Sequence, residues 1–250
     1  IMRLNHLLPP FSNKLVRQAA MAAIDQKQIM QADIGNPKYY RTCAALFGCD
    51  TKYASAVGAD DLIKADPEKS KALLKEAGYP EGFSATLWVM NASREYFPKP
   101  LKTAQFIKEN LQQVNIDLNI EVFNWNEYLN KMHNGEHEIA LIGWTGDYAD
   151  PDNFLYTMLA SENAKPGLAG NYSFYRSKDA DQLLAQARQT TNMSFRRSLY
   201  RRLQETVNYD IPSIPLVHTM PVLAARLSVK GYTPHMTGIE SLEKVSLEID

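Results

Sequence analysis

Residues 143–154 gather most of the groups in this sequence that suit the binding of a small charged ligand. The segment reads Gly-Trp-Thr-Gly-Asp-Tyr-Ala-Asp-Pro-Asp-Asn-Phe, and it holds an indole face, two glycines and three carboxylates. An aromatic face and a carboxylate suit a cationic or ammonium-bearing ligand, and glycine lets the backbone come close to it. The alternative is a turn in which Asp150 or Asp152 caps a short helix.

An apolar segment before this run predicts where it lies in the fold. Residues 138–142 read Glu-Ile-Ala-Leu-Ile, which is typical of a short buried strand. In open α/β sheets, ligands bind in the crevice outside the carboxyl ends of the strands. We therefore expect the loop from Gly143 onward to lie at such an edge.

A second candidate group follows another predicted strand, at residues 83–90. Arg94 and Tyr96 come shortly after this strand. The planar fork of an arginine can hold a carboxylate through two parallel hydrogen bonds. The alternative for Arg94 is a solvated loop charge paired with Glu95, and Tyr96 and Trp144 can be either pocket walls or packing residues.

Catalysis is the competing class of function. Asp147, Asp150 and Asp152 resemble an acid/base set in type, but such a set needs carboxyl groups on opposite sides of a bond, and these share one loop. The sequence has no nucleophile elbow, HExxH, phosphate loop or dinucleotide fingerprint. His133 and His137 are separated by a glycine that ends a helix, which disfavours a metal pair. We predict no enzyme activity, no cofactor and no metal.

The composition and net charge of the chain disfavour some classes of partner. The chain has 250 residues, 45% of them hydrophobic, and a formal net charge of −1. A nucleic-acid-binding protein normally carries a clear basic excess, so we expect no nucleic acid partner. No stretch approaches the roughly 20 apolar residues of a membrane helix, and no signal-peptide pattern begins at Ile1.

Strand and helix patterns alternate through the middle of the chain, which predicts an α/β fold with a mixed sheet flanked by helices. Asn13, Asp25 and Asp66 are expected helix caps, and Pro67 fits a first helical position. The expected helices are at residues 14–24, 67–77, 101–111, 125–133, 179–190 and 194–209, and the expected strands are at 83–90, 116–123, 138–143 and 213–218.

Several motifs, in order along nearly the whole chain, resemble the family of periplasmic dipeptide- and oligopeptide-binding proteins, the family 5 extracellular solute-binding proteins of ABC importers. The resemblance is carried by four segments: Pro9-Pro10-Phe11-Ser12-Asn13 with the helix after it, Asp66-Pro67-Glu68-Lys69 through Gly78-Tyr79, Trp125-Asn126-Glu127-Tyr128-Leu129 with Gly135-Glu136-His137, and Trp144-Thr145-Gly146-Asp147 with Asp150-Pro151-Asp152-Asn153-Phe154.

The resemblance implies a domain organisation. Family members are clamshells of two lobes with the type II, cluster C fold, and this chain starts where the family crosses the hinge into the C-terminal lobe. We expect residues 1–221 to form that ligand-binding lobe. Residues 222–250 are then a return segment that packs on an absent N-terminal lobe. The resemblance further implies a periplasmic location, with the signal peptide outside this chain.

The resemblance also implies roles for individual residues. Asp147 falls on the family's aspartate for the ligand's α-ammonium, and Arg94 falls on its arginine for the ligand's carboxylate. Together with Trp144, Thr145, Gly146 and Tyr96, they form the expected ligand-binding set for a short peptide or similar small solute. The expected partner is an ABC permease in the inner membrane. Haem, a nickel complex or another small solute stays open as the ligand, as does a non-transport interaction or regulatory lobe.

Cys43 and Cys49 are the two cysteines of the chain. Given the family's periplasmic setting, we expect them to form a disulfide, because thiols so close in sequence can pair in an oxidising compartment. The alternative is two buried free thiols. Zinc is not expected, because no second Cys/His pair has matching spacing.

Overall fold

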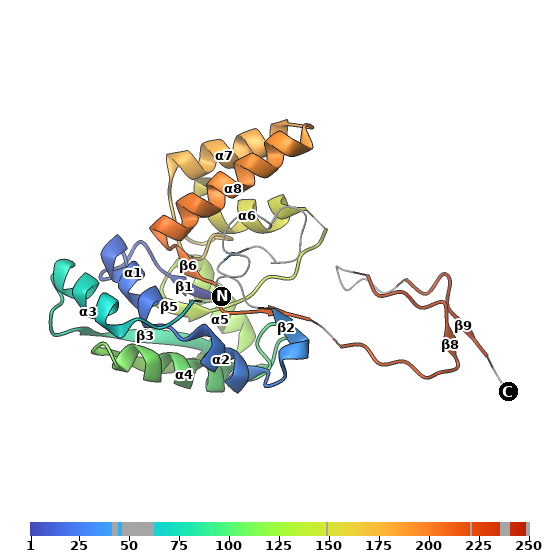
Figure 1. Ribbon diagram of the computed structural model, residues 1–250, viewed down its shortest axis with the longest axis horizontal. Helices are drawn as coiled ribbons and strands as arrows, with labels where there is room; N and C mark the ends of the chain where they lie inside the picture. The colour runs from blue at the N-terminus through green and yellow to red at the C-terminus, as the bar shows by residue number, and fades with distance from the viewer. Residues whose placement is uncertain (42–44, 47–62, 149, 221, 236–240, 249–250) are drawn as a thin grey trace.

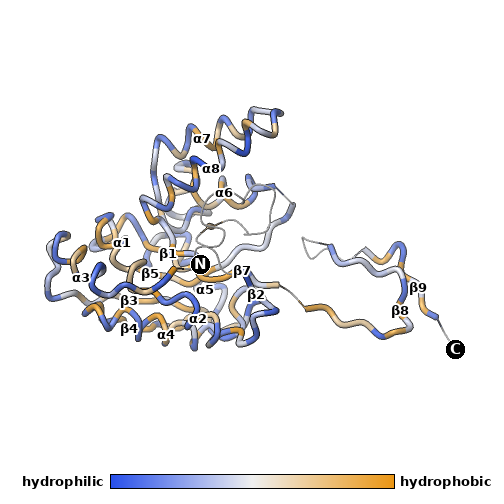
Figure 2. The backbone as a smooth tube through the Cα atoms, in the orientation of Figure 1, coloured by the Kyte–Doolittle hydropathy of each residue, from blue (hydrophilic) through white to orange (hydrophobic). Residues whose placement is uncertain are grey.

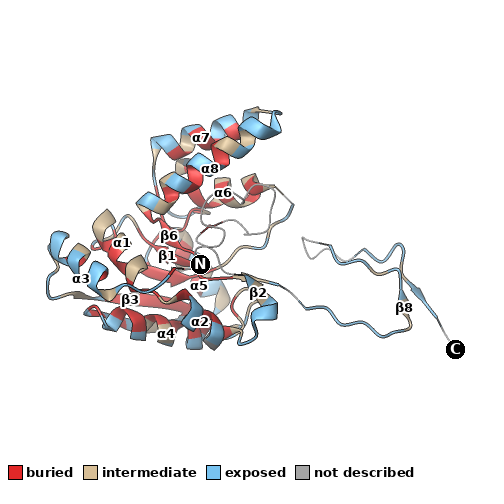
Figure 3. Ribbon diagram, in the orientation of Figure 1, coloured by how far each residue is buried: buried red, intermediate tan, exposed pale blue. Residues whose placement is uncertain are grey.

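The computed structural model describes residues 1–41, 45–46, 63–148, 150–220, 222–235 and 241–248. It has a body built on a sheet, a second layer of helices above that body, and an extended C-terminal arm (Figure 1). Apolar residues concentrate along the sheet and on the inner faces of the helices (Figure 2). Burial follows the same distribution, and most of the described residues of the arm are exposed (Figure 3).

The central sheet has five strands in the order β4-β3-β5-β1-β6. Strands β4, β3 and β5 pair in parallel, and β1 pairs antiparallel with both β5 and β6, so the sheet is mixed as predicted. The strands are β1 Met2–Leu4, β3 Phe83–Met90, β4 Ile116–Phe123, β5 Ile139–Leu141 and β6 Ser213–Ile214.

Helices surround the sheet in two groups. Helices α1 to α4 pack against one another, with α4 against β3 and β4, while α5 lies against β3. Helices α6, α7 and α8 form the second layer around an apolar cluster of their own. The helices are α1 Lys14–Ala23, α2 Gln26–Asp33, α3 Pro67–Glu76, α4 Pro100–Gln112, α5 Trp125–Asn134, α6 Pro151–Leu159, α7 Lys178–Gln189 and α8 Met193–Asp210.

The predicted helix starts are confirmed. The side chains of Asn13, Asp25 and Asp66 each accept a hydrogen bond of 2.9–3.0 Å from a backbone N–H in the first turn of α1, α2 and α3. These bonds satisfy donors that have no partner within the helix. Pro67 is the first residue of α3, where the missing N–H costs nothing.

The strand predicted at residues 213–218 is wrong in its extent. Residues Ser213–Ile214 pair with β1 in the main sheet, whereas β7, His218–Thr219, pairs with β2, Tyr40–Arg41, in a separate two-stranded sheet. Pro215 explains the break, because proline has no N–H to continue the ladder.

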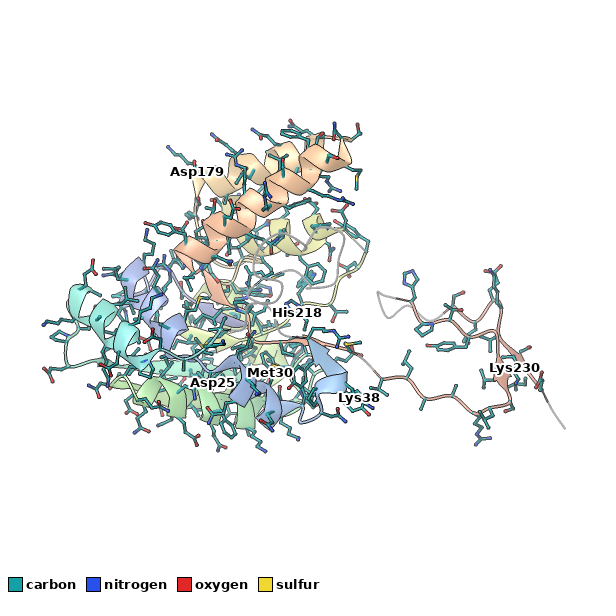
Figure 4. All side chains as sticks on the ribbon, viewed as in Figure 1. Asp25, Met30, Lys38, Asp179, His218 and Lys230 are labelled. Carbon is teal, nitrogen blue, oxygen red and sulfur yellow. The ribbon has the colours of Figure 1, made fainter. Side chains whose placement is uncertain are left out.

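The C-terminal arm extends away from the body (Figure 1). Its two short strands, β8 Val229–Lys230 and β9 Ser246–Leu247, pair only with each other among the described residues. Figure 4 shows Lys230 on this arm, far from Asp25 and Met30 in the body. Leu227 is 94% exposed and Leu247 is 65% exposed, so apolar side chains of the arm face solvent.

Cys43 and Cys49 lie outside the described residues, so their disulfide stays a prediction. Across the ranges that the structure describes, no helix has the length and apolar character needed to cross a membrane.

A buried histidine contacts the segment that leads from α6 to α7. The His137 ring is fully buried, and its Nε2 lies 2.8 Å from the carbonyl oxygen of Tyr172. Burial lowers the pKa of His137 to about 4, since the charged ring would lose its hydration; the hydrogen bond to Tyr172 opposes this shift, and the positive charge of Arg3 adds to it.

This environment predicts an acid-sensitive stability. The folded-state pKa of His137 lies below the usual value of 6.5, so the unfolded chain takes up a proton that the folded chain refuses. His137 does not lower the free energy of unfolding above about pH 6.5. Between pH 6.5 and pH 4 this histidine lowers it by about 1.4 kcal/mol for each pH unit. Chemical denaturation of His137→Gln across this range should show a shallower pH slope. The exposed His235→Gln is the control, and an unchanged slope in His137→Gln would contradict the prediction.

Candidate ligand-binding site

Two loops meet at the carboxyl edge of the sheet. Strands β3 and β5 are parallel neighbours, with Leu87 opposite Ile139, so the loops that follow them leave the sheet at the same edge. They also touch, because a methyl group added at Gly143 would overlap the ring of Tyr96. The structure thus brings the two predicted groups of residues to one edge.

The loop after β3 is anchored next to Arg94. The backbones of Arg94 and Phe97 exchange two hydrogen bonds of 3.0 Å, and the Phe97 side chain is fully buried. The Arg94 guanidinium carbon lies 3.7 Å from the ring centroid of Trp125, a cation–π geometry. Trp125 in turn stacks on Tyr128, with ring centroids 6.3 Å apart. Trp125 thus packs against the main core and also supports the Arg94 side chain.

The Arg94 guanidinium has unused hydrogen-bonding capacity. Its Nε is buried without a hydrogen-bond partner, and within the described ranges Arg94 forms no ion pair with Glu95 or any other carboxylate. A buried donor without a partner costs free energy, which an incoming acceptor would recover. The guanidinium thus lies over an indole ring and makes no hydrogen bond to another of the described residues.

Asn153 organises the loop after β5. Its Oδ1 accepts hydrogen bonds from Trp144 Nε1, at 3.0 Å, and from the backbone N–H of Asp147, at 3.2 Å. Its Nδ2 donates to Asp147 Oδ2 at 3.2 Å. Asn153 is buried in the first turn of α6, whereas Asp147 is exposed. One buried amide thus fixes both the indole and the carboxylate of the loop.

The remaining predicted residues of this loop have distinct environments. Trp144 is partly buried and packs against the apolar cluster of α6, α7 and α8, while Thr145 is exposed. Gly146 lies against the ring of Phe154: a methyl group placed there would be 2.6 Å from Phe154 Cε2. Glycine is therefore required here for close packing of the loop on α6.

The helix-cap alternative for the acidic run is confirmed for Asp150. This residue caps α6, with Oδ1 accepting from the Asp152 N–H at 2.9 Å, and it pairs with Arg196. Asp152 pairs instead with Arg188 at 3.5 Å, and burial raises its pKa. Asp150 and Asp152 are thus used in structural ion pairs, and Asp147 is free of both pairs, which is unlike an acid/base set.

Tyr96 lies between the two loops and is neutral. Burial raises the pKa of its phenol, opposed by the positive charge of Arg94 and by a hydrogen bond with the Gly143 backbone. The ring also packs edge-on against Phe97, with centroids 5.8 Å apart. The Tyr96 ring therefore contacts both loops: Gly143 in the loop after β5 and Phe97 in the loop after β3.

Arg94 and Asp147 do not pair with each other in the described part of the chain. No group of three or more metal-binding side chains occurs among the described residues. A cavity of about 230 Å³ lies elsewhere, between α7 and α8, and is lined by Asp179, Gln182, Leu183, Gln186, Arg202, Glu205 and Thr206. Figure 4 places Asp179 on the outer helical layer, far from His218 near the sheet edge.

Two contributors to this site were not assigned a role from the sequence. Asn153 belongs to a segment that carried the family resemblance, but its hydrogen bonds to Trp144 and Asp147 depend on how α6 folds back. Arg196 lies 46 residues after its partner Asp150. No local pattern indicates such a pairing.

The chain is similar in sequence to known solute-binding proteins. The family model for the middle part of the bacterial extracellular solute-binding proteins, family 5, matches residues 1–166. The chain belongs to this family. The dipeptide-binding protein of Escherichia coli K12 is 37% identical over 183 residues, 73% of this chain. Heme-binding protein A of Haemophilus influenzae is 32% identical over 247 residues, 96% of this chain.

A solved structure gives the same picture for the fold. The dipeptide-binding protein from Pseudoalteromonas sp. SM9913, in complex with Met-Leu, superposes with a TM-score of 0.86 at 30% identity, and the match covers 99% of this chain and 48% of that chain. The chain spans 34% of the E. coli relative and 42% of the H. influenzae relative. These family 5 relatives are named as binding proteins and not as enzymes.

The packing of Gly146 on α6 yields a prediction. Gly146→Ala should destabilise the loop, because the new methyl group collides with the Phe154 ring, with a cost of about 1–3 kcal/mol as for other overpacked sites. Phe154→Leu should relieve the collision, so the alanine should cost less in that background. Thermal unfolding of the two single variants and the double variant measures the effect, and equal costs in both backgrounds would refute the packing explanation.

Proposed function

We propose that this chain is the ligand-binding part of the substrate-binding component of an ABC importer, and that the edge between Arg94 and Asp147 binds a short peptide by its charged termini. The observation that carries the proposal is the Arg94 guanidinium, which rests on Trp125 with a buried Nε that has no partner. An arginine fixed on an aromatic plane is suited to receive a carboxylate in two parallel bonds.

The other end of the ligand would bind at Asp147. Asp147 is exposed on its loop and is held by one amide, so its other oxygen can accept from an ammonium group. Opposite charges at the two ends fix a zwitterion in one orientation, while its side chains vary. Trp144 and Tyr96 would line the space for those side chains, and Thr145 and Gly146 would present backbone to the ligand.

The relatives support this assignment. The E. coli relative is a dipeptide-binding protein, and the Pseudoalteromonas structure holds the dipeptide Met-Leu. The matched proteins also include a periplasmic binding protein associated with an ABC transporter from Helicobacter pylori, in complex with the peptide STSA. For this chain we propose the same setting: the periplasm, with an ABC permease as partner.

The domain organisation is part of the proposal. Residues 1–221 would form the C-terminal ligand-binding lobe, and residues 222–250 would pack on an N-terminal lobe. Two observations support this division. The chain spans less than half of each curated relative named above, and the arm carries exposed apolar residues such as Val222 and Leu227. Exposed apolar surface of this kind is expected where another part of the protein or a partner packs.

Haem is the second candidate ligand, because heme-binding protein A of H. influenzae matches 96% of this chain. A planar porphyrin needs a long apolar slot and has no ammonium for Asp147. The peptide is therefore the better fit to the exposed carboxylate. Titration with haem, followed by its visible absorption, discriminates between the two ligands.

A paired substitution tests the peptide proposal in the protein that carries this chain together with the expected N-terminal lobe. Asp147→Asn should weaken binding of a free dipeptide by about 2–5 kcal/mol, more than tenfold, because the ligand's ammonium then lacks a counter-charge. Arg94→Lys should also weaken binding, since a point charge cannot replace the bidentate fork.

Calorimetry on matched ligands separates the two roles. An N-acetylated dipeptide should lose its sensitivity to Asp147→Asn, and a C-amidated dipeptide should lose its sensitivity to Arg94→Lys. The exposed Asp179→Asn on α7 is the control and should bind as the wild type does. A loss of less than tenfold for Asp147→Asn would overturn its assignment, and unchanged affinity in Arg94→Lys would return Arg94 to a solvated loop charge.

A further inference from the structure

The exposed Asp147 is connected to α8 by a chain of partly buried contacts. We propose that Arg196 is a positioning residue for Asp147 and acts on it through Asp150 and Asn153, so that a helix of the second layer sets how well the ligand's ammonium is recognised. This inference rests on the proposed function of Asp147 and deepens it.

Arg196 is held by three helices at once. Its Nη1 and Nη2 donate to the two carboxylate oxygens of Asp150 at 2.6 and 2.8 Å, the bidentate geometry that fixes orientation as well as distance. Nη2 also donates to the Tyr200 hydroxyl at 3.0 Å, and Nε donates to the Ala187 carbonyl at 2.8 Å. Ala187 lies in the last turn of α7, where carbonyls lack helical partners.

Asp150 receives this fork at the N-cap of α6, directly before its first residue Pro151. Besides its ion pair with Arg196, Asp150 is the cap of α6 and accepts from the Asp152 N–H. The side chains of Arg196 and Asp150 are 14% and 29% exposed, so water screens this pair far less than it screens a surface pair. The Arg196 fork therefore fixes where α6 begins.

The position of α6 then sets the position of the ligand loop. Asn153 is three residues after the cap, and its backbone N–H donates to the Asp150 carbonyl at 3.1 Å. From there its amide reaches Trp144 Nε1, the Asp147 N–H and Asp147 Oδ2. A shift at the start of α6 moves the amide, and with it both the carboxylate and the indole of the loop.

Two neighbouring arginines, Arg188 and Arg197, contact α6 less closely than Arg196 does. Arg188 on α7 pairs with Asp152 at a longer 3.5 Å, and its side chain is 47% exposed. Arg197, the next residue of α8, is exposed, and among the described residues its side chain forms no hydrogen bond or ion pair with α6. Arg196 and Arg197 therefore offer a matched pair of arginines, one in the chain of contacts and one outside it.

The substitutions can separate the ion pair from the helix cap. Asp150→Asn keeps a good cap but cannot form the charged bidentate pair, because asparagine caps helices as well as aspartate does. Arg196→Lys keeps the positive charge but loses the fork and the bond to Ala187. Arg197→Lys is the control. In the double variant of Arg196 and Asp150, the effects should be smaller than their sum, because both remove one interaction.

Two measurements follow the effect from the loop to the ligand. In the 250-residue chain, NMR hydrogen exchange of the Trp144 indole N–H measures how stable its hydrogen bond to Asn153 is. The exchange rate should rise by about fivefold or more in Arg196→Lys and Asp150→Asn. It should stay unchanged in Arg197→Lys. In the protein that includes the N-terminal lobe, the ratio of affinities for a free dipeptide and its N-acetylated form should fall by about fivefold or more in the same two variants.

The outcomes distinguish this inference from the proposed function. A wild-type protein that does not prefer the free amine overturns the proposed role of Asp147 and, with it, this inference. A wild type that prefers the free amine, with the same preference in Arg196→Lys and Asp150→Asn, leaves the proposed function standing and overturns the role of Arg196. Loss of affinity for both peptides alike, without a change in their ratio, also overturns it, because it indicates general destabilisation.

Discussion

The parallel pairing of β3 with β5 is the constraint on which the candidate site depends. Parallel strands end at the same edge of a sheet, so the loops that carry Arg94 and Asp147 leave it side by side. The contact of Tyr96 with Gly143 then fixes the loops to each other. Strand β1 lies on the other side of β5 and runs antiparallel to it, with its three residues opposite Leu141, Ala140 and Ile139. Because β5 pairs on both sides, it lies in the middle of the sheet.

Each loop has its own support, and the two supports differ in kind. Arg94 is supported by apolar packing: Phe97 is buried beneath its loop, and Trp125 offers a flat surface to the guanidinium. Asp147 is supported by polar contacts that pass through Asn153 to the second helical layer. Substitutions at Phe97 or Trp125 should therefore affect the proposed binding of the ligand's carboxylate by Arg94. Substitutions in α6 or α8 should affect the proposed binding of the ligand's ammonium by Asp147.

Local signals predicted much of this fold, and long-range contacts account for what they missed. Caps at Asn13 and Asp66 need a few neighbouring residues, so a short window of sequence identifies them. The division of residues 213–218 between two sheets depends on which strands lie alongside, and Pro215 alone does not indicate it. The sequence predicted that each loop follows a strand. The parallel pairing of β3 with β5, and that of Asp150 with Arg196, 46 residues away, depend on the packed structure.

A crystal structure of the protein that includes the expected N-terminal lobe, with a bound dipeptide, tests the central claim most directly. We expect the ligand's carboxylate to accept two hydrogen bonds from the Arg94 guanidinium, which stays on Trp125. We expect the ligand's ammonium to lie within hydrogen-bond distance of the Asp147 carboxylate. A dipeptide bound with its termini on other residues, while Arg94 and Asp147 contact only solvent, would contradict the account.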